Sequence, residues 1–300
     1  MRVVLGCGNF GGIGSAPAFF GKGETREQAF EVMDAAWKMG LRTFDTADAY
    51  GGGRSETWIG EWIEQTGKQP QITTKTFNPV EAGADWGLAP KRVLRQAESS
   101  LERLGIDRID LYLIHEPDPR TPVAKTLSAF EQLVEHRLVE AWGVSNVSAA
   151  DLGEWLEIGR PALVQNSYSL LDRGDEEELI PLCAEHGIPY QAFSPLAGGW
   201  LTGKYRRGEP APEGSRMTMR PEPYREFETD QVYDAIEAFV AKAEELGVSP
   251  GGLALAWALG VADSVVTGPR RPDHLEQARE ALGLELSPAQ RDEVGSLFPC

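Results

Sequence analysis

Within residues 40–60, GLRTFDTADAYGGGRSETWIG, a strand-like pattern changes to a helix-like pattern, and this change indicates the fold. An apolar, strand-like run over residues 41–46 carries a carboxylate at Asp45, and Tyr50 follows in a glycine-rich turn. Ser55 is then the expected N-cap of a helix with one apolar face. An acid at a strand end and a tyrosine in the next loop are placed for chemistry. Two structural roles explain the same pair equally well: Asp45 would cap a turn, and the Tyr50 ring would pack within its loop.

The same unit, a short apolar strand followed by a helix, recurs along the chain. We expect strands at residues 3–6, 41–46, 71–76, 109–115, 139–144, 163–166, 189–193 and 264–267. We expect helices at residues 26–39, 55–66, 90–104, 123–136, from 149, 176–186, 230–246, 251–259, 272–282 and 288–297. Eight such units with buried-type strands predict a parallel (β/α)8 TIM barrel that spans residues 1–300 as one domain. Its site loops would lie near residues 7–24, 76–90, 116–122 and 196–228.

Composition argues against several classes of function. A formal charge of −17 attracts neither nucleic acid nor an anionic membrane, and no apolar run has the length of a membrane span. Cys7, Cys183 and Cys300 show no metal-binding spacing. The early glycine-rich stretch does not resemble a secretory signal. We therefore expect a cytoplasmic protein without a metal, a membrane or a nucleic-acid partner.

Gly6, Gly8 and Gly11 form a G-x-G-x-x-G pattern directly after the first strand. In a dinucleotide-binding Rossmann unit a helix opens within these glycines and faces the pyrophosphate. Here glycine, proline and serine continue to Gly23, and the helix is expected only after Thr25. We interpret the segment as a loop over a site and not as a Rossmann fingerprint.

Polar residues collect where the predicted strands end. In a TIM barrel these ends form one rim, which carries the active site. The candidates at that rim are Asp45, Tyr50, Lys75, His115, Ser145, Asn146, Gln165, Asn166, Phe193, Ser194, Thr267, Gly268 and Arg270. Polar side chains at the ends of so many apolar strands indicate a functional site.

Lys75 is the most informative of these residues. A lysine near a barrel axis is costly unless it is paired, and Asp45 on the neighbouring strand is the available partner. We expect the Lys75 charge to lower the pKa of Tyr50 and make this phenol a proton donor. His115 would orient a carbonyl or relay the proton, although by itself it could equally cap a strand.

At this point the sequence resembles the aldo-keto reductase family over nearly its whole length. The loop around Asp45 and Tyr50 fits the YGxGxSE variant of that family's signature. ITTK, SSLERLGIDRIDLYLIHEPD, WGVSN, VQNSYS and FSPLAGGWLTGKY follow in family order. The resemblance implies a catalytic tetrad of Asp45, Tyr50, Lys75 and His115, and a nicotinamide cofactor bound without a Rossmann fold.

The resemblance also implies where the cofactor binds. Ser145, Asn146 and Gln165 would hold the carboxamide, and Phe193, in place of the Tyr of many members, would stack on the nicotinamide. Ser194, Leu196, Gly198 and Lys204 would line the pyrophosphate channel, and Gly268, Arg270, His274 and Gln277 would surround the adenosine phosphate. Adjacent Arg270 and Arg271 at a helix start suit a 2′-phosphate, although a solvated pair explains them as well.

Two departures from the family are visible. Ala278 stands where the family often has Asn, which weakens one adenine contact. The sequence also begins at its first strand, without the N-terminal hairpin that closes the barrel floor in other members. Either Val3 and its neighbours cover the floor less fully, or the start differs from the usual one.

The expected function is NADPH-dependent reduction of an aldehyde or ketone, with NADH as the alternative cofactor. Two rivals are a redox-sensing regulatory subunit that binds NADPH with little turnover, and a lyase with Lys75 as Schiff-base nucleophile. Phe10, Phe19 and Trp86 are expected to shape an apolar substrate pocket, which favours aromatic or bulky carbonyl substrates.

Overall fold

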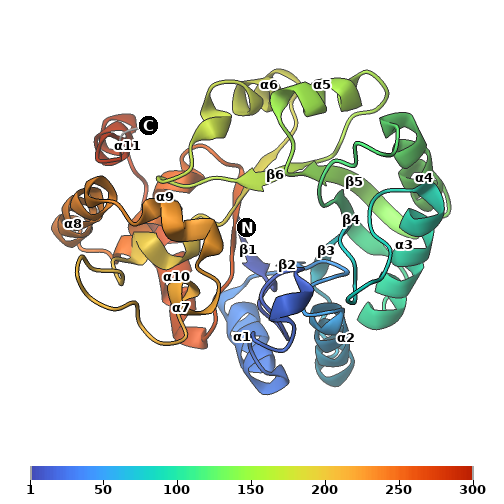
Figure 1. Ribbon diagram of the computed structural model, residues 1–300, viewed down its shortest axis with the longest axis horizontal. Helices are drawn as coiled ribbons and strands as arrows, with labels where there is room; N and C mark the ends of the chain where they lie inside the picture. The colour runs from blue at the N-terminus through green and yellow to red at the C-terminus, as the bar shows by residue number, and fades with distance from the viewer. Residues whose placement is uncertain (1, 299–300) are drawn as a thin grey trace.

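The computed structural model describes residues 2–298 and shows a closed barrel of eight parallel strands in chain order. The strands are β1 (Val3–Gly6), β2 (Thr43–Asp45), β3 (Gln71–Thr76), β4 (Ile109–Ile114), β5 (Val139–Ser145), β6 (Val164–Ser167), β7 (Tyr190–Phe193) and β8 (Ser264–Thr267). Helices surround this ring (Figure 1). The predicted TIM barrel is therefore confirmed; Cys300 lies outside the described residues.

The helices follow the strands as the sequence indicates. They are α1 (Arg26–Met39), α2 (Arg54–Thr66), α3 (Pro90–Leu104), α4 (Val123–Glu135), α5 (Ala149–Leu156), α6 (Leu179–Glu185), α7 (Arg216–Met219), α8 (Asp230–Glu245), α9 (Pro250–Leu259), α10 (Leu275–Gly283) and α11 (Pro288–Ser296). The short α7 lies inside the long segment after β7 that was expected to be a loop. Its proline- and glycine-rich surroundings conceal a one-turn helix from pattern analysis.

Ser55 does not cap α2, contrary to the prediction. Gly53, at φ 85°, is the N-cap, and the helix starts one residue earlier, at Arg54. The Ser55 hydroxyl is buried, where it donates to the Cys7 carbonyl oxygen at 2.9 Å and accepts from the Thr46 hydroxyl at 2.8 Å. Ser55 thus fastens α2 to the ends of β1 and β2, next to the loop that carries Tyr50.

Strand register brings the candidate residues to one level of the barrel. Asp45 pairs with Gly6 on one side and Thr73 on the other, while Gln165 pairs with Ser145 and Gln191. Parallel strands share one C-terminal rim, so each of these ends faces the same space.

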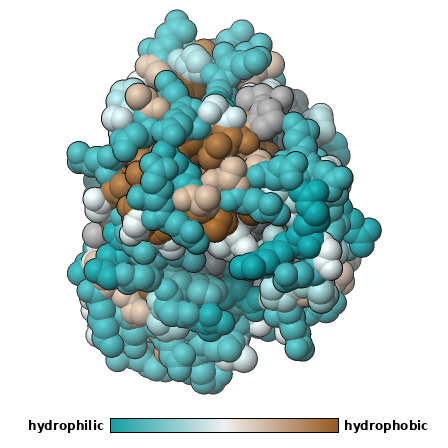
Figure 2. Space-filling model, turned by 90° about the vertical axis from the view of Figure 1, so that its left-hand side faces the viewer, coloured by the Kyte–Doolittle hydropathy of each residue, from teal (hydrophilic) through white to brown (hydrophobic). Residues whose placement is uncertain are grey.

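Polar side chains dominate one face of the molecule. On the side that carries α8 and α11, hydrophilic residues cover most of the face, and apolar ones gather near its centre (Figure 2). Within residues 2–298, no helix combines the length and the apolar character needed to cross a bilayer.

Candidate active site

Lys75 and Asp45 form a buried ion pair at the inner end of the barrel rim. The Lys75 ammonium, on a side chain only 1% exposed, donates to Asp45 Oδ1 at 2.5 Å and to the Thr46 carbonyl oxygen at 2.8 Å. It also lies 5.2 Å from the ring centroid of Tyr50. β2 and β3 are neighbouring strands, so their pairing by itself brings Lys75 next to Asp45.

The charges of these groups follow from burial and from each other. Burial disfavours the Lys75 ammonium, but Asp45 and Tyr50 outweigh it, so the pKa of Lys75 is raised above 10.5. Burial raises the pKa of Tyr50 above 10.0, and the Lys75 charge offsets only part of this rise. The expected lowering of the Tyr50 pKa is therefore wrong. A permanently charged lysine that is committed to Asp45 is also a poor Schiff-base nucleophile.

His115 completes the group as a neutral imidazole. Its ring meets that of Tyr50 edge to face, with centroids 5.6 Å apart. Burial, aided by the Lys75 charge, lowers the pKa of His115 to about 3. Its Nδ1 lies 3.5 Å from the Asn78 amide nitrogen, and a hydrogen bond donated by that amide goes with the tautomer that carries the ring proton on Nε2. A neutral imidazole of this kind orients a carbonyl by donating a hydrogen bond, and it does not relay a proton as a cation.

One cavity of about 930 Å³ opens above these residues. Asp45, Tyr50 and His115 line it, while Lys75 lies below its surface. Every residue implied for cofactor binding also lines it: Ser145, Asn146, Gln165, Phe193, Ser194, Leu196, Gly198, Lys204, Gly268, Arg270, His274 and Gln277. The loops after seven of the eight strands, all but β3, therefore contribute to a single space.

Amide side chains occupy the end of the cavity near Tyr50. Asn146 adopts a left-handed conformation at φ 55°, and its amide donates to the His115 carbonyl oxygen at 2.9 Å. The Asn166 side chain binds both backbone polar groups of Val147, the residue after Asn146. It accepts from Val147 N–H at 3.1 Å and donates to the Val147 carbonyl oxygen at 2.8 Å. The strained backbone at Asn146 is thus held by the neighbouring strand end.

A tight turn after β7 forms one wall. Ser194 and Ala197 have positive φ angles of 53° and 46°, and Gly198 and Gly199 continue the left-handed backbone. A side chain on Gly198 would come within 2.6 Å of the Tyr224 ring, so only glycine fits there. The turn therefore presents its backbone closely to the cavity.

Cationic side chains gather at the opposite end of the cavity. Arg270 donates through Nε to the buried Glu24 carboxylate and through Nη1 to the Gly214 carbonyl oxygen. Lys204 shares this region, and burial together with the Arg270 charge lowers its pKa. Arg271, which is 66% exposed, instead pairs with Asp273 at 2.9 Å. Among the described residues, no cluster of His, Cys, Asp and Glu has the makings of a metal site.

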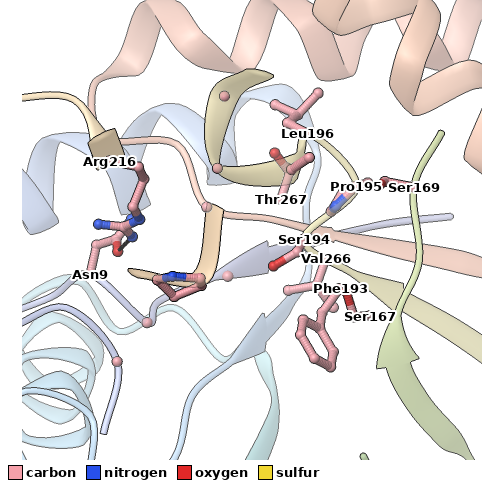
Figure 3. Close-up of a pocket in the computed structure, with 18 of the residues that line it drawn as sticks. Asn9, Ser167, Ser169, Phe193, Ser194, Pro195, Leu196, Arg216, Val266 and Thr267 are labelled. Atoms are coloured by element: carbon pink, nitrogen blue, oxygen red, sulfur yellow. Dashed lines mark hydrogen bonds between the residues drawn. The ribbon is translucent and has the colours of Figure 1, made fainter. Parts of the chain in front are cut away.

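Sequence reasoning missed Arg216 and Asn9. Their side chains bond to each other across 207 positions of sequence and line the cavity. Figure 3 shows this pair on one side and Phe193 with Ser194 on the other. Arg216 lies in the short α7, and no local pattern distinguishes it from the other arginines of that segment.

The three aromatic residues expected in the substrate pocket do not line the cavity. Phe10 is fully buried in the core, and Phe19 packs beneath the Arg220 guanidinium. Trp86 is 46% exposed and is covered by Arg120, 3.4 Å from its ring centroid. Aromatic residues in loops anchor those loops as readily as they line pockets. The apolar lining comes instead from Ile13, Leu171, Pro223, Tyr224 and Phe227.

The chain is similar to several known proteins over most of its length. The NADH-specific methylglyoxal reductase of Escherichia coli is 31% identical over 295 residues, which cover 92% of this chain and 89% of that protein. A putative voltage-gated potassium channel subunit beta of Schizosaccharomyces pombe is 31% identical over 90% of this chain and 83% of its own length. The structure of a glycerol dehydrogenase from Gluconobacter oxydans superposes with a TM-score of 0.84 at 25% identity, covering 99% and 90% of the two chains.

The family match covers almost the whole barrel. Residues 2–297 fit the Aldo/keto reductase family, from the first strand to the last helix. This chain belongs to the aldo/keto reductase family of oxidoreductases.

Proposed function

We propose that this protein is an NADPH-dependent reductase that converts an aldehyde or ketone to an alcohol. The observation that carries the proposal is the juxtaposition, in one cavity, of Tyr50 beside the Lys75–Asp45 pair with a cationic far end. The first group suits proton donation to a carbonyl, and the second suits an anionic cofactor.

The residues that line the cavity fit such a cofactor along its length. Amide groups at one end match a carboxamide, and the glycine turn allows close approach of a pyrophosphate. Lys204, Arg270 and Arg216 suit phosphate oxygens, which favours NADPH over NADH. When bound, the nicotinamide supplies the hydride that reduces the carbonyl carbon.

The chain's own residues complete the reaction. Neutral His115 donates a hydrogen bond that orients the carbonyl oxygen, and the Tyr50 hydroxyl transfers its proton to that oxygen as the hydride arrives at carbon. The phenolate left on Tyr50 is stabilised by the Lys75 charge, which Asp45 holds in place. The carbonyl substrate would leave as an alcohol.

Replacing Tyr50 tests this assignment. Tyr50→Phe removes the proton donor and keeps the ring, so kcat should fall by roughly 100-fold or more. The Kd for NADP+, measured by fluorescence titration, should stay within about twofold. Tyr233→Phe on α8, outside the cavity lining, is the matched control and should keep wild-type kcat. Aldehyde reduction by Tyr50→Phe at the wild-type rate would show that Tyr50 is not the donor.

A regulatory subunit is the second candidate, because several relatives of similar identity carry the name of potassium channel beta subunits. Steady-state turnover with a panel of aldehydes separates the two functions. Reduction of any aldehyde at about 1 s⁻¹ or faster supports the reductase, as this is the low end of ordinary enzymes. Tight NADP+ binding without turnover supports regulation.

Substrate class and location belong to the same proposal. The apolar lining from Ile13, Leu171 and Phe227 suits aromatic or bulky carbonyls better than small sugars. We infer a cytoplasmic protein in which residues 1–300 act as one domain, and the free thiols of Cys7 and Cys183 are consistent with a reducing compartment.

A further inference from the structure

A chain of buried polar side chains crosses the barrel interior below the cavity. Gln165 Nε2 donates to Asp45 Oδ2 and to Gln191 Oε1, each at 2.7 Å. Gln191 Nε2 donates in turn to the Ser264 hydroxyl at 2.8 Å. With the Lys75–Asp45 pair, these contacts link β3, β2, β6, β7 and β8 in one network.

The chemistry of this chain fixes its direction. Beside the Lys75 ammonium, Asp45 acts as a carboxylate and only accepts, so the Gln165 NH2 group must face it. The second N–H of that group then points at Gln191, which must present its oxygen and turn its own NH2 toward Ser264. A flip of either amide would oppose two donors or two acceptors in a buried place, which is costly.

The free atom of Gln165 is therefore its carbonyl oxygen. No hydrogen bond from any residue between 2 and 298 reaches Gln165 Oε1, and Gln165 lines the cavity beside Ser145 and Asn146. An acceptor at this place suits an N–H donor of a ligand. Gln191 is 5% exposed and does not line the cavity, so it acts only through Gln165.

We propose that Gln191 is a positioning residue that fixes the Gln165 amide with its oxygen toward the cavity, so that the site selects a nicotinamide carboxamide over a ring substituent without N–H donors. This inference rests on the proposed function, since it presumes a nicotinamide ring beside Gln165. It assigns ring selectivity to Gln191 on β7, three strands from Asp45 around the barrel, which does not line the cavity.

Two dinucleotides test the inference, NADP+ and its 3-acetylpyridine analogue, which replaces the carboxamide NH2 with a methyl group. Selectivity is measured as the Kd of the 3-acetylpyridine analogue divided by the Kd of NADP+, both from tryptophan fluorescence titration. Gln191→Met keeps the length of the side chain without an amide, so the ratio should fall roughly three- to tenfold, the value of one hydrogen bond. Gln191→Glu still offers an acceptor to Gln165 and should retain most of the wild-type ratio.

Further variants keep the test decisive. Ser264→Ala removes the hydroxyl that accepts the hydrogen bond from Gln191. It should lower the ratio by a smaller factor, and it provides a test even if Gln191→Met folds poorly. Gln71→Met, the same change at the exposed start of β3, is the matched control and should leave the ratio unchanged.

The outcomes separate the two levels of proposal. If Gln165→Met alters the ratio but Gln191→Met does not, the positioning role is wrong and the cofactor assignment stands. Equal weakening of both dinucleotides by Gln191→Met would show a merely structural role and would also overturn the inference. If the wild-type protein binds neither dinucleotide, the proposed function fails, and the inference fails with it.

Discussion

The carboxyl of Asp48 is fully buried directly behind the site. Its backbone N–H donates to the Lys75 carbonyl oxygen at 3.0 Å, and one carboxyl oxygen accepts from the Thr76 hydroxyl at 2.8 Å. Its Oδ1 has no hydrogen-bond partner among the described residues, and Arg92 Nη2 lies 4.0 Å from the other carboxyl oxygen, Oδ2. Burial, with the nearby Glu56 carboxylate, raises the pKa of Asp48 from 3.8 to about 7.

This shift predicts a specific pH dependence of stability. Between pH 4 and pH 7 the folded protein keeps the Asp48 proton and the unfolded chain does not, so the contribution of Asp48 to stability declines as pH rises through this window. Asp48→Asn cannot ionise, so it should gain up to about 4 kcal/mol relative to wild type between pH 4 and pH 8. Urea denaturation across this range measures the difference. A stability difference that does not change with pH would contradict the shifted pKa.

At the scale of elements, α2, which directly follows the loop that carries Tyr50, packs closely on α3. Gly60 in α2 lies against the end of α3, where a Cβ would come within 2.4 Å of the Arg103 carbonyl oxygen. The two helices approach this closely only because Gly60 has no side chain. The bounds of α1 and α3 were predicted correctly, because apolar periodicity and glycine stops are local signals, whereas the start of α2 was missed by one residue and β2 is shorter than expected.

Gly60→Ala should therefore destabilise the fold by roughly 1–3 kcal/mol, the usual cost of overpacking against atoms that cannot move. Gly153→Ala is the matched control, since Gly153 lies in α5 with nothing within 4 Å of the added Cβ. It should be neutral or stabilising by about 0.5–1 kcal/mol, because alanine is the better helix former. Thermal and urea denaturation compare the two. Similar losses in both variants would show that helix propensity, and not packing, decides.

At the scale of the whole molecule, Arg270 joins segments that are far apart in sequence. From the loop after β8 it reaches Glu24 in the loop after β1 and Gly214 in the segment after β7, at separations of 246 and 56 residues. One guanidinium thus fastens two cavity loops while it lines the cationic end of the cavity. The cofactor preference proposed above depends on this arrangement.

Arg270→Ala should weaken NADP+ binding much more than NAD+ binding. The change removes a donor for the 2′-phosphate and leaves the Glu24 carboxylate without its cation, and both effects act against an added negative charge. The Kd for NADP+ should rise roughly tenfold or more, as expected for a charge-assisted hydrogen bond. Arg271→Ala, which removes an exposed Asp273 partner, is the control and should change either Kd by less than about twofold. Equal losses of both cofactors in Arg270→Ala would exclude the 2′-phosphate role.

The sequence by itself determined the barrel, the Lys75–Asp45 pair and the set of residues at the rim. These follow from local periodicity and from the rule that parallel strands share one active end. Only the tertiary structure decided how those residues interact. The Gln165–Asp45 bond spans 120 positions and the Arg216–Asn9 bond 207, and neither has a local signal. The neutral His115 and the raised Tyr50 pKa also depend on burial, which is a property of the folded surroundings and not of the sequence nearby.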